Sequence, residues 1–236
     1  MPKIDAVARG PAGPNMNAKR DIYTDAYKLL APMRIPSPVL VDGGACVGSI
    51  TKLFLRAWPN SRVCAFEASR DLVVQLCKQY GKNPRVTVHD KALSNKDGKI
   101  KFNITEYIGT ASILKPSLQS KKFNGSKVSI VKTVQVDCTR LDTILPHVDM
   151  LKLDVQGSEI KALEGSVKLF DKIKLILVEV MFYAAYDNEP LFCDINSFLD
   201  KNDFQLFNIY NMSTNETGKL TFGEALYINN RFYNKY

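Results

Sequence analysis

V-L-V-D-G-G-A-C-V-G, from Val39 to Gly48, is the stretch that most constrains the structure of this 236-residue chain. An apolar run stops at Asp42, glycines follow, and Ser49–Trp58 then has the apolar spacing of a helix. Glycine lets the backbone approach a ligand closely and adopt positive φ. The first turn of a helix offers free N–H donors. The order of strand, glycine turn and helix therefore predicts a cradle for a nucleotide-bearing cofactor.

An acidic residue stands where such a cofactor needs one. Glu67 follows a second apolar run, Val63–Phe66, and lies 19 residues after Gly48. An acidic side chain at that distance, after the next strand, is placed to accept hydrogen bonds from ribose hydroxyls. The glycine run alone also fits a tight turn in an unrelated α/β protein. The spacing of Glu67 favours the cofactor.

Strand and helix patterns alternate along most of the chain. The strands expected in the main sheet are Val39–Asp42, Arg62–Phe66, Arg85–His89, Asp149–Val155, Lys174–Val180, Phe204–Tyr210 and Ala225–Asn229. The expected helices are Asp21–Leu30, Ser49–Trp58, Arg70–Tyr80, Leu141–Leu145, Glu159–Phe170 and Phe192–Lys201. This alternation predicts an α/β fold with a doubly wound, mainly parallel seven-stranded sheet that ends in an antiparallel C-terminal β-pair. Lys99–Ile104 and Lys127–Val136 predict inserted strands, and the polar stretch Gly109–Asn124 between them is a candidate lid.

The composition is that of a globular protein. Hydrophobic residues make up 45% of the chain, and no apolar run is long enough to span a membrane. We expect residues 1–18 to form a flexible arm, without the apolar core of a signal peptide, and residues 19–236 to form a single domain. The five cysteines are scattered, which favours reduced thiols in a cytoplasmic protein.

The charge leaves the partner open. A formal net charge of +8 favours nucleic acid, phosphates or an anionic membrane surface as partners, but it also serves solubility. The basic residues show none of the interleaving with aromatic residues that reads single-stranded nucleic acid. His89 and His147 are far apart and form no zinc-spaced set, so no metal site is assigned. The pattern does not predict an oligomeric state.

The glycine turn also discriminates between cofactors. Dinucleotide-binding folds favour G-x-G-x-x-G, whereas Gly44–Gly48 gives G-x-x-x-G. The carboxylate of Asp42 would repel a diphosphate and suits a cationic ligand. S-adenosylmethionine carries a sulfonium and an amino group, so the pattern favours this methyl donor over a nicotinamide dinucleotide.

Motifs spread along the chain resemble a known family. In order they are V-D-G-G-A-C-V-G (41–48), F-E-A-S (66–69), A-L-S-N-K-D-G (92–98), A-S-I-L (111–114) and L-K-L-D-V-Q-G-S-E (151–159). With the final hairpin, this combination resembles the FkbM-type methyltransferases over residues 38–230. The resemblance implies a Rossmann-like fold, S-adenosylmethionine as cofactor and, for many members, methylation of hydroxyls on sugars or natural products. Two positions depart from the family pattern: Cys46 replaces a frequent asparagine, and Gln156 replaces the glutamate of D-V-E-G.

Three groups of residues are candidates for holding the cofactor. Its methionine end would be lined by the turn residues Asp42, Gly43, Gly44, Ala45 and Gly48. Its ribose hydroxyls would donate to Glu67, which Ala68 or Ser69 would flank. The resemblance places the adenine contacts at Asp90, Lys91 and Ala92, although Asp90 and Lys91 also fit a solvated turn.

Four charged residues are candidates for the chemistry: Asp154, Lys152, Glu159 and Glu179. Asp154 ends the fourth strand, at the edge where open α/β sheets bind ligands, and either it or Glu159 could take the proton of the acceptor. Lys152 shares a strand face with Asp154 and would depress its pKa, unless the two form only a structural ion pair. Glu159 also fits a first-turn residue favoured by the helix dipole. Glu179 is a charge in an apolar strand, which indicates a partner or a site.

The leading interpretation is O-methylation of a hydroxyl on a sugar or another small-molecule acceptor. The first alternative is an RNA ribose 2′-O methyltransferase, which the charge favours and for which Lys152, Asp154 and Glu179 supply parts of a Lys-Asp-Lys-Glu set. The fifth strand, however, ends in Val180-Met181, with no second lysine. The second alternative is a cofactor-binding module with a degenerate acceptor site, for which Gln156 is the relevant residue. The clustered carboxylates leave a metal requirement open.

Overall fold

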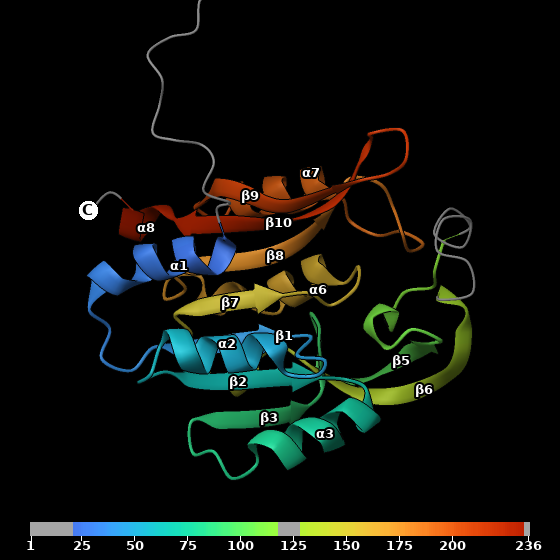
Figure 1. Ribbon diagram of the computed structural model, residues 1–236, viewed down its shortest axis with the longest axis horizontal. Helices are drawn as coiled ribbons and strands as arrows, with labels where there is room; N and C mark the ends of the chain where they lie inside the picture. The colour runs from blue at the N-terminus through green and yellow to red at the C-terminus, as the bar shows by residue number, and fades with distance from the viewer. Residues whose placement is uncertain (1–20, 118–127, 234–236) are drawn as a thin grey trace, which may run out of the picture.

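The computed structural model describes residues 21–117 and 128–233. Its main sheet has seven strands in the order β3-β2-β1-β7-β8-β10-β9 (Figure 1). These strands are β1 (Val39–Gly43), β2 (Arg62–Glu67), β3 (Val86–Asp90), β7 (Met150–Leu153), β8 (Leu175–Met181), β9 (Phe204–Thr214) and β10 (Leu220–Asn229). The first five run parallel, and β10 runs antiparallel to both β8 and β9. The predicted α/β fold, with its antiparallel C-terminal pair, is confirmed.

Helices cover both faces of the main sheet (Figure 1). One face carries α1 (Ile22–Leu30), α2 (Ser49–Ala57) and α3 (Arg70–Tyr80), and the other carries α6 (Glu159–Glu164) and α7 (Phe192–Asp200). Successive residues of β1 point to opposite faces of the sheet. Leu40 packs against the face that carries α1 and α2, and Val41 packs against the face that carries α6 and α7. With both faces covered, a ligand reaches the sheet at the ends of its strands.

A second, three-stranded sheet lies beyond the carboxyl ends of β1, β2 and β3 (Figure 1). It consists of β4 (Ala92–Leu93), β5 (Gly98–Thr105) and β6 (Ile130–Thr139), in the order β4-β6-β5. Phe102 and Cys138 of this sheet pack with Ala68 and Ala92. The predicted β-rich insert is therefore confirmed, and it forms a wall at the carboxyl edge of the main sheet.

The helix predicted over Glu159–Phe170 is wrong in length. Helix α6 ends at Glu164, and a 3-10 turn, η4 (Val167–Leu169), follows it. A Cβ at Gly165 would lie 2.0 Å from the carbonyl oxygen of Ser94. The helix stops where two backbones touch, a contact that local periodicity does not encode. The other short helical elements are η1 (Ala31–Met33), η2 (Ile108–Thr110), α5 (Leu141–Ile144) and α8 (Asn230–Tyr233).

Some expectations fall on residues outside the described ranges. These are the N-terminal arm, residues 1–18, and residues 118–124 of the candidate lid. Among residues 21–117 and 128–233, no helix combines the length and the apolar character needed to cross a bilayer.

Candidate functional site

The glycine turn after β1 brings three strand ends together. Gly44 has φ +73°, and a Cβ there would lie 1.9 Å from the carbonyl oxygen of Asp154. The N–H groups of Gly44 and Ala45 both donate to the carbonyl oxygen of Phe66 at 3.0 Å. The turn therefore packs directly against the ends of β2 and β7, and only glycine fits at position 44.

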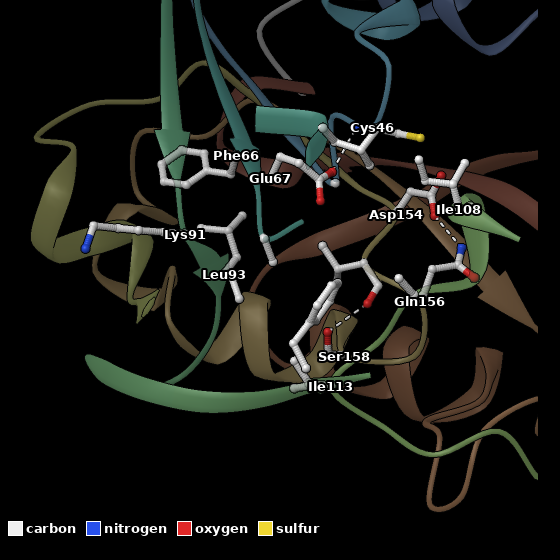
Figure 2. A pocket seen from close by; sticks show the side chains of 18 residues that line it. Cys46, Phe66, Glu67, Lys91, Leu93, Ile108, Ile113, Asp154, Gln156 and Ser158 are labelled. Atoms are coloured by element: carbon white, nitrogen blue, oxygen red, sulfur yellow. Dashed lines mark hydrogen bonds between the residues drawn. The ribbon is translucent and has the colours of Figure 1, made fainter. Parts of the chain in front are cut away.

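Two backbone donors fix the carboxylate of Glu67. Oε2 accepts from the N–H of Cys46 at 2.9 Å, and Oε1 accepts from the N–H of Ser69 at 2.8 Å. Figure 2 shows this carboxylate pointing into a cavity. Burial raises the pKa of Glu67, while the two N–H groups favour the ionised form and oppose the shift. Each oxygen keeps acceptor capacity for a ligand hydroxyl.

A buried ion pair lies behind the glycine turn. Lys152 Nζ is 3.2 Å from Asp42 Oδ1 and donates to the carbonyl oxygens of Gly43 and Gly44, at 3.2 and 3.1 Å. Burial alone would lower the pKa of Lys152, but the charges of Asp42 and Asp154 outweigh it and raise that pKa. Lys152 thus stays charged, clamps the turn, and lies 3.9 Å from Asp154 Oδ2.

Gln156 bridges two carboxylates from neighbouring strand ends. Its Nε2 donates to Asp154 Oδ1 at 2.7 Å and to Glu179 Oε2 at 3.1 Å, and its Oε1 accepts from the hydroxyl of Tyr186 at 2.9 Å. Its backbone has φ +53°, a conformation that costs a non-glycine residue about 1–3 kcal/mol. Burial, followed by the charges of Asp154 and Glu159, raises the pKa of Glu179 well above its ordinary value. A strained backbone next to an acid with a shifted pKa is typical of functional sites.

The first cavity opens at the carboxyl ends of β1, β2 and β7. Its apolar walls include Phe66, Leu72, Leu93, Phe102 and Ile113. Its charged groups are Glu67, Asp154 and Lys91, and Figure 2 shows the Lys91 ammonium extending away from the two carboxylates. An apolar pocket with a few convergent polar groups is the usual form of a cofactor site.

A second cavity adjoins the first. It is formed by the end of β8, the segment after β8, and the turn between β9 and β10. Glu179 lines this second cavity, whereas Asp154 lines the first. Gln156 lines both, so the bridge between the carboxylates is also the boundary between the cavities.

The predicted site residues divide between the cavities and the layer behind them. Those that line the first cavity are Gly44, Glu67, Ala68, Lys91, Ala92 and Asp154. Glu179 lines the second cavity. Lys152 lies behind the glycine turn, as described. Glu159 is buried, and its Oε1 accepts from the N–H groups of Val155 and Gly157 at 3.0 and 3.3 Å. Glu159 therefore shapes the turn that carries Gln156.

Five residues predicted to contact the cofactor lie outside the lining of the first cavity. Asp42 is fully buried against Lys152, and Gly43 packs against the side chains of Leu153 and Leu93. Ala45 belongs to a buried apolar cluster with Leu76, and the carbonyl of Gly48 accepts from the hydroxyl of Tyr80 at 2.8 Å. Asp90 forms an ion pair with Arg70. Asp42, Gly43, Ala45 and Gly48 thus support the glycine turn on the side away from the cavity. Asp90 pairs with Arg70 at the surface.

Several residues of the first cavity are absent from the sequence-based set. Phe66 directly precedes Glu67 and Leu72 follows it by five residues, so the sequence pattern near Glu67 already contained two of the apolar wall residues. Phe102 and Ile113 come from the inserted region, where no local signal marks a pocket. Within residues 21–117 and 128–233, no group of three His, Cys, Asp or Glu side chains is arranged to hold a metal ion.

Fold and site together define a class: an α/β protein with a glycine turn after its first strand and a buried carboxylate at the end of its second. The methyltransferase FkbM domain model matches residues 42–206, more than half of the chain. The chain belongs to the FkbM methyltransferase family. It is an S-adenosylmethionine-dependent methyltransferase, as the motifs of the sequence indicate.

A curated relative and solved structures accompany this match. The 2-O-methyltransferase NoeI of Sinorhizobium fredii (strain NBRC 101917 / NGR234) is 24% identical over 172 residues, covering 69% of this chain and 71% of NoeI. Magnesium protoporphyrin IX methyltransferase (ChlM) from Synechocystis PCC 6803, with bound SAM, has a TM-score of 0.48 at 15% identity and covers 86% of this chain and 76% of its own. An rRNA methylase from Streptococcus thermophilus has a TM-score of 0.49 at 12% identity, covering 90% and 98%. Neither structure indicates the acceptor of this chain.

Proposed function

We propose that this chain transfers the methyl group of S-adenosylmethionine to a hydroxyl oxygen of a sugar or another small molecule. The observation that carries the proposal is the arrangement of acids across the two cavities. Glu67 lies inside the first cavity, and the bridge of Asp154, Gln156 and Glu179 stands where that cavity meets the second. A donor and an acceptor need such a junction to react, because transfer requires the two reacting atoms to be held in contact.

The residues of the first cavity fit the donor. Both oxygens of Glu67 are fixed in place by backbone N–H groups and would accept from the two ribose hydroxyls. Phe66, Phe102 and the other apolar walls would enclose the adenine ring. The carboxylate of Asp154 would face the cationic end of the donor. When bound, S-adenosylmethionine would supply a methyl carbon that its sulfonium activates. Transfer to the hydroxyl oxygen would form an O–C bond as the C–S bond breaks, and the electron pair of the C–S bond would stay on sulfur.

The second acid supports proton removal. Glu179 lines the second cavity, where an acceptor would lie, and would take the hydroxyl proton on a carboxylate oxygen. Burial raises the pKa of Glu179, which makes its carboxylate a stronger base than an exposed one. Lys152 and Glu159 would act as positioning residues, because each holds backbone of the turns that present these acids. The name of NoeI, a 2-O-methyltransferase, supports oxygen as the accepting atom.

Labelled methyl transfer tests this proposal. The full chain is incubated with methyl-labelled S-adenosylmethionine and, separately, with a pool of neutral glycosides and with RNA. We expect label on a hydroxyl oxygen of a glycoside. Glu179→Gln should slow transfer without loss of donor affinity, whereas Asp154→Asn, which removes a carboxylate from the donor cavity, should also weaken donor binding. Label on RNA ribose alone would favour the nucleic-acid alternative that the charge of +8 suggests. Firm donor binding without transfer to either pool would favour the degenerate module.

A further inference from the structure

The second cavity is built from segments far apart in the chain. Its floor is Glu179 and Met181 of β8, and its walls come from the segment after β8 and from the end of the β9–β10 hairpin. Figure 1 shows that hairpin and that segment at the same end of the sheet, on the side of the carboxyl ends of the parallel strands. The cavity therefore faces the edge at which the donor site opens.

Gln156 connects the cavities. Within residues 21–117 and 128–233, it is the one residue that lines both. Its amide lies between Asp154 on the donor side and Glu179 on the other side. A molecule in the second cavity would thus meet the methyl donor beside Gln156, within reach of Glu179.

The walls offer aromatic faces next to polar edges. Tyr183, Tyr186 and Phe222 contribute rings, while Ser213 and Asn215 of the hairpin contribute a hydroxyl and an amide. Flat apolar faces with hydrogen-bonding groups around them suit a ring whose faces carry C–H groups and whose rim carries hydroxyls.

The titratable carboxyl and amino groups that line the cavity are mainly acidic. Glu179 and Glu189 lie in its inner part, with Glu189 buried, and the exposed residues Glu216 and Lys219 oppose each other in sign near its rim. Burial raises the pKa of Glu179 and of Glu189, the latter to about 7, and among the described lining residues no lysine or arginine lies beside them. An anion in this inner part would find no countercharge, so the cost of removing it from water would stay uncompensated.

We propose that the second cavity is the acceptor site, and that it takes an uncharged, hydroxyl-bearing ring while it excludes phosphorylated and carboxylated ones. This assignment rests on the O-methyl transfer proposed above. It adds the location of the acceptor site and the prediction that neutral acceptors are preferred over anionic ones. This preference runs against RNA, whose phosphates would have to approach the two inner glutamates.

Matched acceptors test this preference. The probes are methyl glycosides of glucose, mannose and galactose, their uronates and their 6-phosphates, each offered with methyl-labelled S-adenosylmethionine and also scored for binding by saturation-transfer NMR. We expect neutral glycosides to bind and to accept label, with kcat/KM about tenfold or more above that of the charged partners. Equal or better use of the anions, or neither binding nor transfer with any neutral probe, would overturn the inference.

Two aromatic variants test the location. Phe222→Ala removes a wall of the second cavity, whereas Tyr233→Ala removes an aromatic side chain of similar exposure, 44% against 38%, in helix α8. We expect Phe222→Ala to raise the acceptor KM about fivefold with unchanged donor affinity, and Tyr233→Ala to change neither. Oxygen methylation with an unchanged acceptor KM in Phe222→Ala would refute the cavity assignment and leave the proposed function standing. Methyl groups found on nitrogen or carbon would refute the proposed function instead.

Discussion

The amide nitrogen of Gln156 lies 2.7 Å from Asp154 Oδ1, and the same nitrogen reaches Glu179. A primary amide has two N–H donors, so one side chain satisfies both carboxylates at once. A glutamate at this position, as in the family pattern, would place a third acid between two others. The glutamine removes that repulsion and holds the two acids at the junction of the cavities.

Removal of the bridge should change how activity depends on pH. The amide donors favour the ionised form of Glu179, so Gln156→Ala should raise the pKa of Glu179 further and move the acid limb of kcat/KM upward by about half to one pH unit. Gln156→Glu should move it further, because it adds negative charge. The control is Gln205→Ala, an exposed amide on β9. A uniform loss of rate with no movement of the acid limb would mean that Gln156 only supports the turn.

A methyl group at Gly44 should disrupt the turn on which the donor site is built. Gly44→Ala would bring Cβ within 1.9 Å of a backbone oxygen. We therefore expect the free energy of unfolding to fall by more than about 2 kcal/mol, and we expect donor binding to be lost as well. Gly218→Ala is the matched control, because Gly218 has φ +80° with nothing within 4 Å of an added Cβ. It should cost about 1 kcal/mol, the conformational term alone. Equal losses in the two variants, measured by denaturant unfolding, would contradict the close-contact explanation.

The buried ion pair should be costly to break from one side. Lys152→Met leaves the fully buried Asp42 without its cation, and we expect a loss of about 3–5 kcal/mol in unfolding free energy. The double variant Lys152→Met with Asp42→Asn should recover much of this loss, since the uncompensated charge is gone. Lys99→Met, at an exposed position of β5, is the control. A double variant no more stable than the single one would show that Lys152 stabilises the fold mainly through the turn carbonyls.

Glu159 should make the fold less stable as pH rises. Burial raises its pKa from 4.5 to about 7, so the folded state holds this proton more tightly than the unfolded state does. The resulting contribution is present below pH 4.5 and is lost as pH rises through 7. Glu159→Gln keeps a neutral acceptor, and we expect it to gain about 1–3 kcal/mol over the parent at high pH and little at low pH. Glu216→Gln, at an exposed position, should show no such difference. Unfolding of the parent and both variants at pH 5 and pH 8.5 gives the answer, and equal effects of Glu159→Gln at both values would contradict it.

The sequence predicted those parts of the structure that depend on local residue patterns and spacing. The strand ending at Glu67 and the turn at Gly44 follow from apolar runs and glycines, and Ile22–Leu30 follows from helical spacing. The contacts that finish the site depend on distant segments. Gln156 meets Glu179 and Tyr186, 23 and 30 residues further along, and no local pattern encodes such a meeting.

Capping shows the same limit on a smaller scale. Serine is a favoured N-cap residue, yet Ser69 occupies the N-cap position of the helix that begins at Arg70 without a side-chain capping bond. Its backbone N–H donates to the buried carboxylate of Glu67, a contact that helix-capping preference does not predict.

Calorimetric titration of S-adenosylmethionine into Glu67→Gln tests the donor site most directly. The glutamine keeps the size of the side chain but offers a single acceptor oxygen where the ribose diol needs two. We expect affinity to fall about tenfold or more and Glu216→Gln to bind like the parent. Because one of the two backbone N–H groups loses its acceptor, the unfolding midpoint of Glu67→Gln should fall somewhat, and cooperative unfolding above the titration temperature shows that the variant is folded. Parent-like affinity in a folded Glu67→Gln variant would mean that the ribose does not bind Glu67 and that the first cavity does not hold the donor as described.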